Sequence, residues 1–409
     1  MSTPCSSHWL RREVQEVADV ILSNVDKKTR PSETPVLLCN YTDVLYNDYI
    51  HSRIEFMRAS ASGREIEKFS LHEGDVIITK DSETREDIAE TVAVVERLDG
   101  VLCGYHLAIL RPKQDRVDGR FLAAALKADS THSQLAAAAN GITRFGLTMS
   151  ALRKVKVCLP PLPEQRKIAE ILTTWDEALA LLDRRIELAR ERKKGLMQRL
   201  LTGRVRFPEF AGEPWEEHKL GTVVERVTRK NTTGCDTVLT MSGELGLVSQ
   251  TEYYSKRIAS RDTSHYYLLR RGEFAYNKST SQGYPFGAIK RLDDYDEGVL
   301  STLYICFRLR DPERFSSDFL AHYFEGGRLN KGIYAIAQEG ARNHGLLNIS
   351  VSDFFGLRLE LPSLPEQRRI AGVLETCDEE IALLERKREL TAQQKTGLMQ
   401  RLLTGRVRV

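Results

Sequence analysis

The stretch that decides the fold is residues 159–206, LPPLPEQRKIAEILTTWDEALALLDRRIELARERKKGLMQRLLTGRVR. It recurs as residues 361–408, LPSLPEQRRIAGVLETCDEEIALLERKRELTAQQKTGLMQRLLTGRVR. The two segments align without a gap at an offset of 202 residues, with 32 identities in 48 positions. Internal repetition of this kind is the first feature to settle in a fold prediction. Two copies of one segment therefore end two halves of the chain.

Each copy predicts one long helix. Pro163 stands where such a helix begins, because proline has a fixed φ and no N–H to lose there, and Gly203 supplies the stop. Between them apolar residues recur at alternating steps of four and three, the pattern of a coiled-coil seam. We expect the two helices to pair with each other in antiparallel orientation. The predicted seam consists of Ile168, Leu172, Trp175, Leu179, Leu182, Ile186, Leu196, Leu200, Ile370, Leu374, Ile381, Leu384, Leu398 and Leu402.

The regions before the two copies are less alike but keep a common skeleton. Gly74-Asp75-Val76-Ile77-Ile78-Thr79-Lys80 parallels Gly272-Glu273-Phe274-Ala275-Tyr276-Asn277-Lys278 at an offset of 198 residues. Residues 71–79, 89–96, 101–110 and 299–308 predict strands, and residues 121–128, 133–139 and 318–325 predict helices. The predicted fold class is α+β with a pseudo-two-fold internal repeat. Two globular halves, 1–160 and 207–361, alternate with the helical segments 161–206 and 362–409.

Composition excludes several classes of protein. The 409 residues carry a net charge of only +3, so nucleic-acid binding would need local clustering of charge. No apolar run approaches the ~18 residues of a membrane span, and no secretory signal is visible, so we expect a cytoplasmic protein without membrane contact. The seven cysteines never form Cys-x-x-Cys, and the nine histidines never form His-Glu-x-x-His. We expect no metal site.

Polar loops after equivalent strands are the candidates for DNA contact. Lysine offers a cation for phosphate, and serine, threonine, asparagine and glutamine address base edges. The loops also fit a plain solvated surface, and the glycine-flanked segments fit tight turns that need glycine for backbone reasons. The candidates are Lys80, Ser82, Thr84, Arg85, Thr143, Arg144, Lys278, Ser279, Ser281, Gln282, Tyr284, Arg342, Asn343 and His344.

A basic cluster occupies residues 184–206, where nine Lys or Arg face only Glu187 and Glu191. The local charge of +7 predicts contact with phosphates or with an acidic partner, and a solvated helix face explains it equally well.

Catalytic motifs are missing from the sequence. The only Pro-Pro pair lies between leucines, unlike the base-holding loop of an amino-methyltransferase, and no phosphate loop of the Gly-x-x-x-x-Gly-Lys-Ser/Thr type occurs. We predict no catalytic residue and no cofactor for this chain. Two alternatives stay open, namely a methyltransferase or nuclease with an unrecognised site, and a coiled-coil scaffold that does not recognise DNA sequence.

The two Leu-Pro-Pro/Ser-Leu-Pro-Glu-Gln-Arg segments, each leading into a helix that ends in Gly-Leu-Met-Gln-Arg-Leu-Leu-Thr-Gly-Arg, resemble the conserved regions of a known family. That family is the specificity (S) subunit of type I restriction-modification enzymes. The strand motifs 74–80 and 272–278, with the opening Trp215-Glu216-Glu217-His218-Lys219-Leu220-Gly221, are similar to its target recognition domains. The resemblance covers the whole chain.

The resemblance implies a non-catalytic subunit that recognises double-stranded DNA in a phage-defence complex. Each globular half would be a target recognition domain that recognises one half of a split, asymmetric site, and the helices would act as spacers. Two modification (M) subunits would dock on the helices and carry S-adenosylmethionine for adenine methylation. Restriction (R) subunits would bring ATP and Mg for cleavage.

Overall fold

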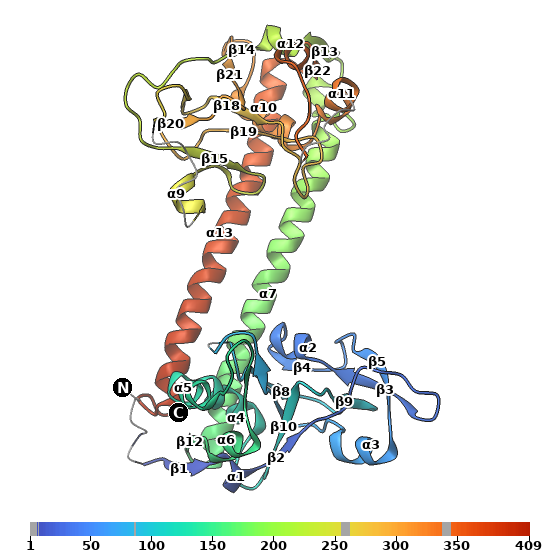
Figure 1. The fold of residues 1–409 in the computed structure, drawn as a ribbon. Coiled ribbons are helices and arrows are strands. Elements are labelled where there is room, and N and C mark those ends of the chain that lie inside the picture. Colours follow the sequence, from blue (N-terminus) through green and yellow to red (C-terminus); the bar gives the residue numbers. More distant parts are fainter. Residues whose placement is uncertain (1–5, 7, 86, 255–261, 338–344) are drawn as a thin grey trace. The chain divides into compact units, whose positions relative to one another are not determined.

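The structure, a computed structural model, describes residue 6 and residues 8–85, 87–254, 262–337 and 345–409 (Figure 1). The chain divides into two compact units. Unit 1 comprises Met1–Arg184 together with Glu385–Val409, and unit 2 comprises Arg185–Leu384. Each unit therefore holds one globular half and a part of both long helices, and the two are described separately.

The repeated segments form the two long helices that the sequence predicts. Helix α7 spans Leu162–Leu200 and α13 spans Leu364–Leu403. Each begins one residue before its proline. Gly203 (φ +65°) and Gly405 (φ +69°) follow their ends in the left-handed conformation that favours glycine and closes a helix. Among the helices of the described residues, none combines the length and the apolar character that a bilayer span requires.

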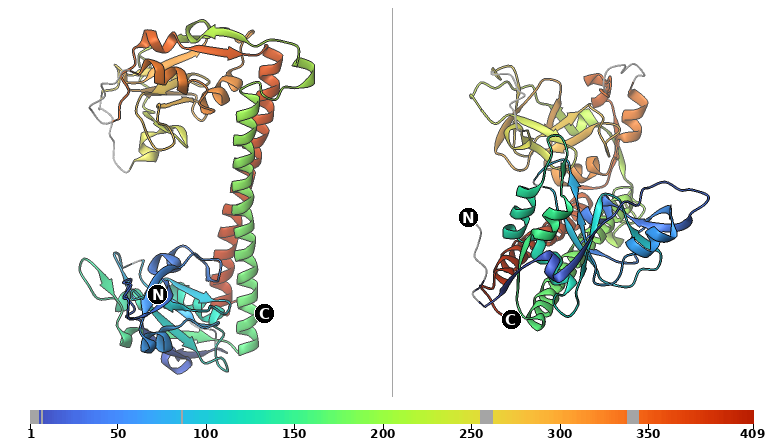
Figure 2. Two further views of the ribbon diagram at one scale, coloured as in Figure 1. Left: turned by 90° about the vertical axis from the view of Figure 1, so that its right-hand side faces the viewer. Right: turned by 60° about the horizontal axis from the view of Figure 1, so that its bottom comes forward.

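The two helices run antiparallel, as predicted. In unit 1, Lys395 near the end of α13 forms an ion pair with Asp176 in the first half of α7. In unit 2 the same two positions of the repeat exchange roles, because Lys193 near the end of α7 pairs with Asp378 in the first half of α13. In each unit the first half of one helix thus lies beside the second half of the other (Figure 2). Lysines at these seam positions meet aspartates of the other copy.

Every residue predicted for the seam is buried or half-buried. The buried members are Ile168, Leu172, Leu182, Ile186, Leu200, Ile370, Leu374, Leu384 and Leu402. The half-buried members are Trp175, Leu179, Leu196, Ile381 and Leu398. In unit 1, Leu402 packs into the core that also contains Ile168, and in unit 2, Leu200 packs into the core that contains Ile370. The apolar period therefore locates the packed face of both helices.

An arginine after each long helix holds a buried glutamate at the start of the other. In unit 2 the Arg206 guanidinium donates from Nε and Nη2 to the two carboxylate oxygens of Glu366, at 2.9 and 2.6 Å. In unit 1, Arg408 donates to Glu164 in the same way, at 2.6 and 2.9 Å. Such bidentate pairs fix geometry as well as charge. This contact explains why the Pro-Glu-Gln-Arg and Gly-Arg-Val-Arg motifs occur together in each copy.

The glutamine of the Pro-Glu-Gln-Arg motif ties each long helix to a second helix. In unit 1, buried Gln165 accepts the Asp118 N–H at 3.0 Å, and Asp118 caps the N-terminus of α4 (Gly119–Lys127). In unit 2, buried Gln367 accepts the Ser316 N–H at 2.8 Å, and Ser316 caps α10 (Ser317–Glu325). N-terminal amides of helices need such partners. The motif therefore orients the globular half on its long helix.

Unit 1 is built around a five-stranded sheet of order β2-β10-β6-β8-β4. Its strands are β2 (Ala18–Leu22), β10 (Leu107–Pro112), β6 (Val76–Thr79), β8 (Thr91–Val94) and β4 (Tyr49–Ile50). Central β6 is buried throughout, and Ile77 pairs antiparallel with Ile109. A three-stranded sheet contains β5 (Met57–Ala61), β3 (Thr34–Cys39) and β9 (Val101–Cys103), and β1 (Leu10–Glu13) pairs with β12 (Lys156–Leu159). Helix α4 packs against β8.

Unit 2 repeats this frame with a four-stranded sheet of order β14-β21-β18-β19. Its strands are β14 (Val224–Arg226), β21 (Ile305–Leu309), β18 (Phe274–Asn277) and β19 (Ala288–Arg291). Small antiparallel pairs join β13 (Glu216–Lys219) to β22 (Arg358–Leu361), β15 (Leu239–Ser242) to β16 (Gly246–Ser249), and β17 (Tyr267–Arg270) to β20 (Glu297–Leu300). Phe121 of α4 and Phe319 of α10 are equivalent and fully buried. The two halves therefore share a fold.

Short helices complete both units. Unit 1 contains α1 (Val14–Val17), α2 (Tyr41–Leu45), α3 (Gly63–Phe69), α5 (Asp129–Ala138) and α6 (Met149–Lys154). Unit 2 contains α8 (Leu220–Val223), α9 (Gln250–Tyr253), α11 (Asn330–Ile336), α12 (Val351–Phe355) and the 3-10 turn η1 (Pro208–Phe210).

Two strand predictions are wrong in the same way. Residues 101–110 contain β9 and most of β10, and residues 299–308 contain the second half of β20 and most of β21. Turns separate them at residues 104–106 and 301–304, which the long apolar patterns on either side conceal in the sequence. Gly104 permits the first turn, because a Cβ at this position would lie 2.6 Å from the Cys39 carbonyl oxygen.

Candidate nucleic-acid interface

In unit 1 the loop after Lys80 and the glycine-flanked segment 141–146, which the sequence analysis treated as separate candidates, lie side by side. Lys80 follows β6, and the short strand β7 (Asp81–Ser82) begins directly after it. Strand β7 pairs antiparallel with β11 (Phe145–Gly146), which closes the glycine-flanked segment 141–146. The Leu147 N–H also donates to the Lys80 carbonyl oxygen at 2.7 Å. The loop after the central strand and the glycine-flanked segment therefore form one surface.

The same junction occurs in unit 2. The Leu347 N–H donates to the Lys278 carbonyl oxygen at 3.0 Å, and the Thr280 N–H donates to the Gly345 carbonyl oxygen at 2.7 Å. A Cβ at Gly345 would lie 2.5 Å from the Thr280 hydroxyl, and its φ of +72° also favours glycine. The candidates Arg342, Asn343 and His344 lie outside the described residues. Gly345, the first described residue after them, contacts the Lys278 loop through its carbonyl oxygen.

Several candidate side chains of unit 1 are engaged within the unit. The Lys80 ammonium donates to the Ser23 carbonyl oxygen at 2.8 Å, and its burial lowers the pKa of this amine. Ser82 is buried, and its hydroxyl accepts the Thr84 N–H. The Thr84 hydroxyl donates to Asp87 at 2.6 Å. These three side chains therefore hold the loop in place within the unit.

The other candidates of unit 1 are exposed. Thr143 and Arg144 lie in the turn between Gly141 and β11. The Arg85 guanidinium lies 5.1 Å from the centre of the Phe145 ring, a cation–π contact that holds it beside this turn. Arg85, Thr143 and Arg144 are therefore exposed on the same part of the surface.

In unit 2 the loop after β18 forms a tight turn closed by Ser281 and Tyr284, with Gly283 at φ +80°. Ser279, Ser281 and Gln282 are exposed, and Lys278 is half-buried. Tyr284 is held in place instead, because its hydroxyl donates to Glu325 at 2.8 Å. Burial, followed by the charge of Glu325, raises the pKa of Tyr284.

Residues 104–106 at the same sheet edge were missed by the sequence analysis. The Lys80 N–H donates to the His106 carbonyl oxygen at 3.0 Å, and the Lys80 ammonium lies 5.6 Å from the centre of the exposed Tyr105 ring. In unit 2 the equivalent turn presents Leu303, which is 66% exposed. The sequence did contain a signal for this turn, because Gly104-Tyr105-His106 interrupts an apolar run.

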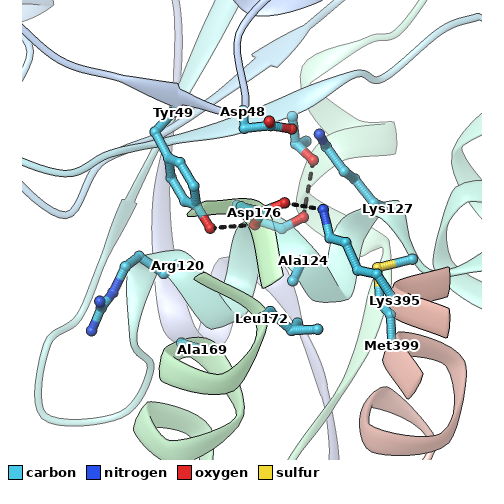
Figure 3. A pocket seen from close by; sticks show the side chains of 12 residues that line it. Asp48, Tyr49, Arg120, Ala124, Lys127, Ala169, Leu172, Asp176, Lys395 and Met399 are labelled. Carbon is cyan, nitrogen blue, oxygen red and sulfur yellow. Dashed lines mark hydrogen bonds and ion pairs between the residues drawn. The ribbon is translucent and has the colours of Figure 1, made fainter. Parts of the chain in front are cut away.

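A hollow between the sheet and the long helices of unit 1 serves a different purpose (Figure 3). The Tyr49 hydroxyl donates to Asp176 Oδ2 at 2.7 Å, and Lys395 pairs with the other carboxylate oxygen. Burial is the main cause that raises the pKa of Tyr49. Because these polar groups bond to one another, we assign the hollow a structural role. No group of three or more metal-ligating side chains occurs in the parts of the chain that the structure describes.

Known proteins resemble the chain over both halves. Residues 7–190 match a family model described as the type I restriction modification DNA specificity domain. A curated relative from Methanocaldococcus jannaschii, the putative type I restriction enzyme MjaX specificity subunit, is 22% identical, and the match covers 98% of this chain and 94% of the relative. The MjaVIII specificity subunit of the same organism is 27% identical over 62% of this chain and 63% of its own length.

The family model and the curated relatives support assignment of the chain to the specificity subunits of type I restriction-modification enzymes. Such subunits supply DNA recognition and not catalysis, and they work with M and R subunits.

Solved structures support the fold of this specificity subunit. The S subunit of a type I system from M. genitalium has a TM-score of 0.54 and 15% identity, and the alignment covers 96% of each chain. A chain from a structural study of complex assembly and conformational transition of the type I R-M system has a TM-score of 0.54 and 18% identity. That alignment covers 98% of this chain and 97% of the other. The likeness extends over both globular halves and both long helices.

Proposed function

We propose that this specificity subunit binds a split, asymmetric site on double-stranded DNA, with one half-site recognised by each unit. The observation that carries the proposal is the repeated junction at the end of the central strand. In both units a polar loop pairs with a glycine-flanked segment on the same backbone frame. The side chains differ, with Arg85 and Arg144 in one unit and Ser281 and Gln282 in the other. The two units therefore present different side chains on the same backbone arrangement, as expected of a protein that recognises two different short sequences.

Mapping of methylated adenines tests this proposal. The subunit is expressed with its M subunits in a host that lacks other adenine methylation, and we expect one split motif. Arg144→Ala should relax or change only the half recognised by unit 1, and the double variant Lys278→Ala/Gln282→Ala only the other half. Each variant is the matched control of the other. Unchanged motifs in both would contradict the assignment of these loops, and a wild-type complex without a split motif would contradict the proposed function.

We propose further that two M subunits dock on α7 and α13, one on each. The support is a set of exposed leucines that repeats at the offset of 202 residues. Leu181 on α7 and Leu383 on α13 are equivalent and are 63% and 71% exposed, and the equivalent pair Leu188 and Leu390 is also exposed. Leucines seven residues apart share a helix face.

The comparison with the buried seam strengthens this reading. Seam positions differ between the copies, as with half-buried Trp175 and buried Cys377, although burial constrains them. The exposed leucines are identical although internal packing does not require it. Identical partners need identical surfaces, so the repetition fits two copies of one subunit.

Native mass spectrometry of the assembled complex tests the number and place of M subunits. Leu181→Gln/Leu188→Gln should remove one M subunit, and adding Leu383→Gln/Leu390→Gln should remove both. A control at Glu191→Ala, an exposed position that differs between the copies, should keep two. Retention of both M subunits by the fourfold variant would contradict the docking surface.

In this proposal the chain itself carries no cofactor. S-adenosylmethionine would be bound by the M subunits, and ATP with Mg by the R subunits.

A further inference from the structure

The turn at residues 104–106 is fixed firmly at the recognition edge of unit 1. Its backbone is bonded to the start of the Lys80 loop through the His106 carbonyl oxygen, at 3.0 Å. On its other side, the Gly104 N–H donates to the Cys39 carbonyl oxygen at 2.8 Å, where no side chain would fit at residue 104. A side chain on this turn is therefore held in a defined position relative to β7 and β11.

The His106 ring is oriented by a carboxylate. Its Nδ1 lies 2.8 and 2.9 Å from the two oxygens of Asp81, the first residue of β7. An ionised carboxylate only accepts hydrogen bonds, so Nδ1 carries the proton. In the neutral ring, Nε2 is then a hydrogen-bond acceptor. Within the described residues Nε2 has no hydrogen-bond partner, and the side chains of His106 and Asp81 are 19% and 21% exposed.

This arrangement does not match nucleophilic catalysis. A histidine that activates a nucleophile of its own chain needs a serine, threonine or cysteine at Nε2, and the described part of the chain places none there. It matches recognition of a hydrogen-bond donor that comes from outside the chain.

We propose that His106 is a specificity-determining residue that accepts a hydrogen bond, at Nε2, from the exocyclic amino group of an adenine or a cytosine in the first half-site. The inference rests on the proposed function and adds a base-reading group to it. Adenine N6 and cytosine N4 are the amino donors at the major-groove edge, whereas guanine O6 and thymine O4 present acceptors that repel a second lone pair. Asp81 is a positioning residue that acts through the ring.

The equivalent turn of unit 2 has a different chemistry. There Tyr304 takes the place of His106, and burial is the main cause that raises the pKa of its hydroxyl. Its neighbour Leu303 is apolar and exposed. Recognition of an amino group by this turn is therefore a property of unit 1 alone, which provides a matched control.

The test removes the amino group from the DNA and the acceptor from the protein. The complete complex with M subunits is bound to oligonucleotides in which single adenines of the first half-site are replaced by purine and cytosines by 2-pyrimidinone. At one position the wild type should lose roughly tenfold in affinity. His106→Ala should already be weaker by this factor and should lose nothing more on the same substitution. Tyr304→Phe should behave as the wild type.

A second variant guards against misfolding. Asp81→Ala keeps the imidazole but frees its orientation, so its loss on removal of the amino group should fall between those of the wild type and His106→Ala. Equal losses for wild type and His106→Ala at every position would overturn the role of His106. A wild-type complex with no sequence preference at all would instead overturn the proposed function.

Discussion

Replacing Gln165 by Met should destabilise the chain by about 3 kcal/mol, since three hydrogen bonds of about 1 kcal/mol each are lost. The buried amide of Gln165 accepts the Asp118 N–H at 3.0 Å and donates to the carbonyl oxygens of Arg116 and Pro160 at 3.1 and 2.8 Å. Methionine has a similar length and no branch, so it fills the space while leaving three backbone groups without partners. The same change at Gln367 removes two hydrogen bonds, to the Ser316 N–H and to the Pro362 carbonyl oxygen, and should cost about 2 kcal/mol.

Two measurements check the size and the place of these losses. Thermal unfolding of the full chain should show a lower midpoint for Gln165→Met, by about 6–12 °C for a unit of this size. Amide hydrogen exchange under native conditions should show faster exchange at Asp118 in Gln165→Met only, and at Ser316 in Gln367→Met only. Each variant serves as the control for the other.

The reasoning would be refuted by a loss below about 1 kcal/mol for Gln165→Met with unchanged protection at Asp118. That result would mean that the amide bonds are replaced by others at no net loss, and that the glutamine is not what joins α4 to α7.

Two further substitutions test contacts of unit 2. Arg206→Ala leaves fully buried Glu366 without its cation and should destabilise the chain by about 3 kcal/mol in urea unfolding. Adding Glu366→Gln should restore part of that stability, and no recovery would argue against an uncompensated charge. Gly287→Ala should be strongly destabilising, since its Cβ would lie 2.2 Å from the Asn277 carbonyl oxygen at φ +77°. Gly283→Ala, at φ +80° in open space, should lower the thermal midpoint less, and equal losses would count against the close approach.

The long helices could be predicted from the sequence because their signals are local. A proline at the start, a glycine after the end and an apolar period between them lie within one segment. The pairing partner also followed, because each copy offers the other a matching seam. The ion pairs of the seam also join equivalent positions of the two copies, with Lys395 and Asp176 in one unit and Lys193 and Asp378 in the other.

The candidate interface could be predicted only in part. The equivalence of the loops after Lys80 and Lys278 was visible as an offset, but the pairing of β7 with β11 joins residues more than 60 positions apart, which no local pattern reports. The sequence also did not show which side chains bond within the unit and which remain exposed. Lys80 turns to a carbonyl oxygen of a distant strand end, whereas Arg85 remains at the surface. His106 was overlooked because a turn inside an apolar run resembles a continuous strand.

The last residues of the chain belong to the first unit, since unit 1 combines Met1–Arg184 with Glu385–Val409. During translation the amino-terminal half leaves the ribosome first, and domains ordinarily fold in that order. Here Arg408 must arrive before Glu164 obtains its cation, and by then every residue of unit 2 has been synthesised. The half that is made first is completed last, so a polypeptide that is cut off after residue 384 carries its defect in the unit that holds its amino-terminal half.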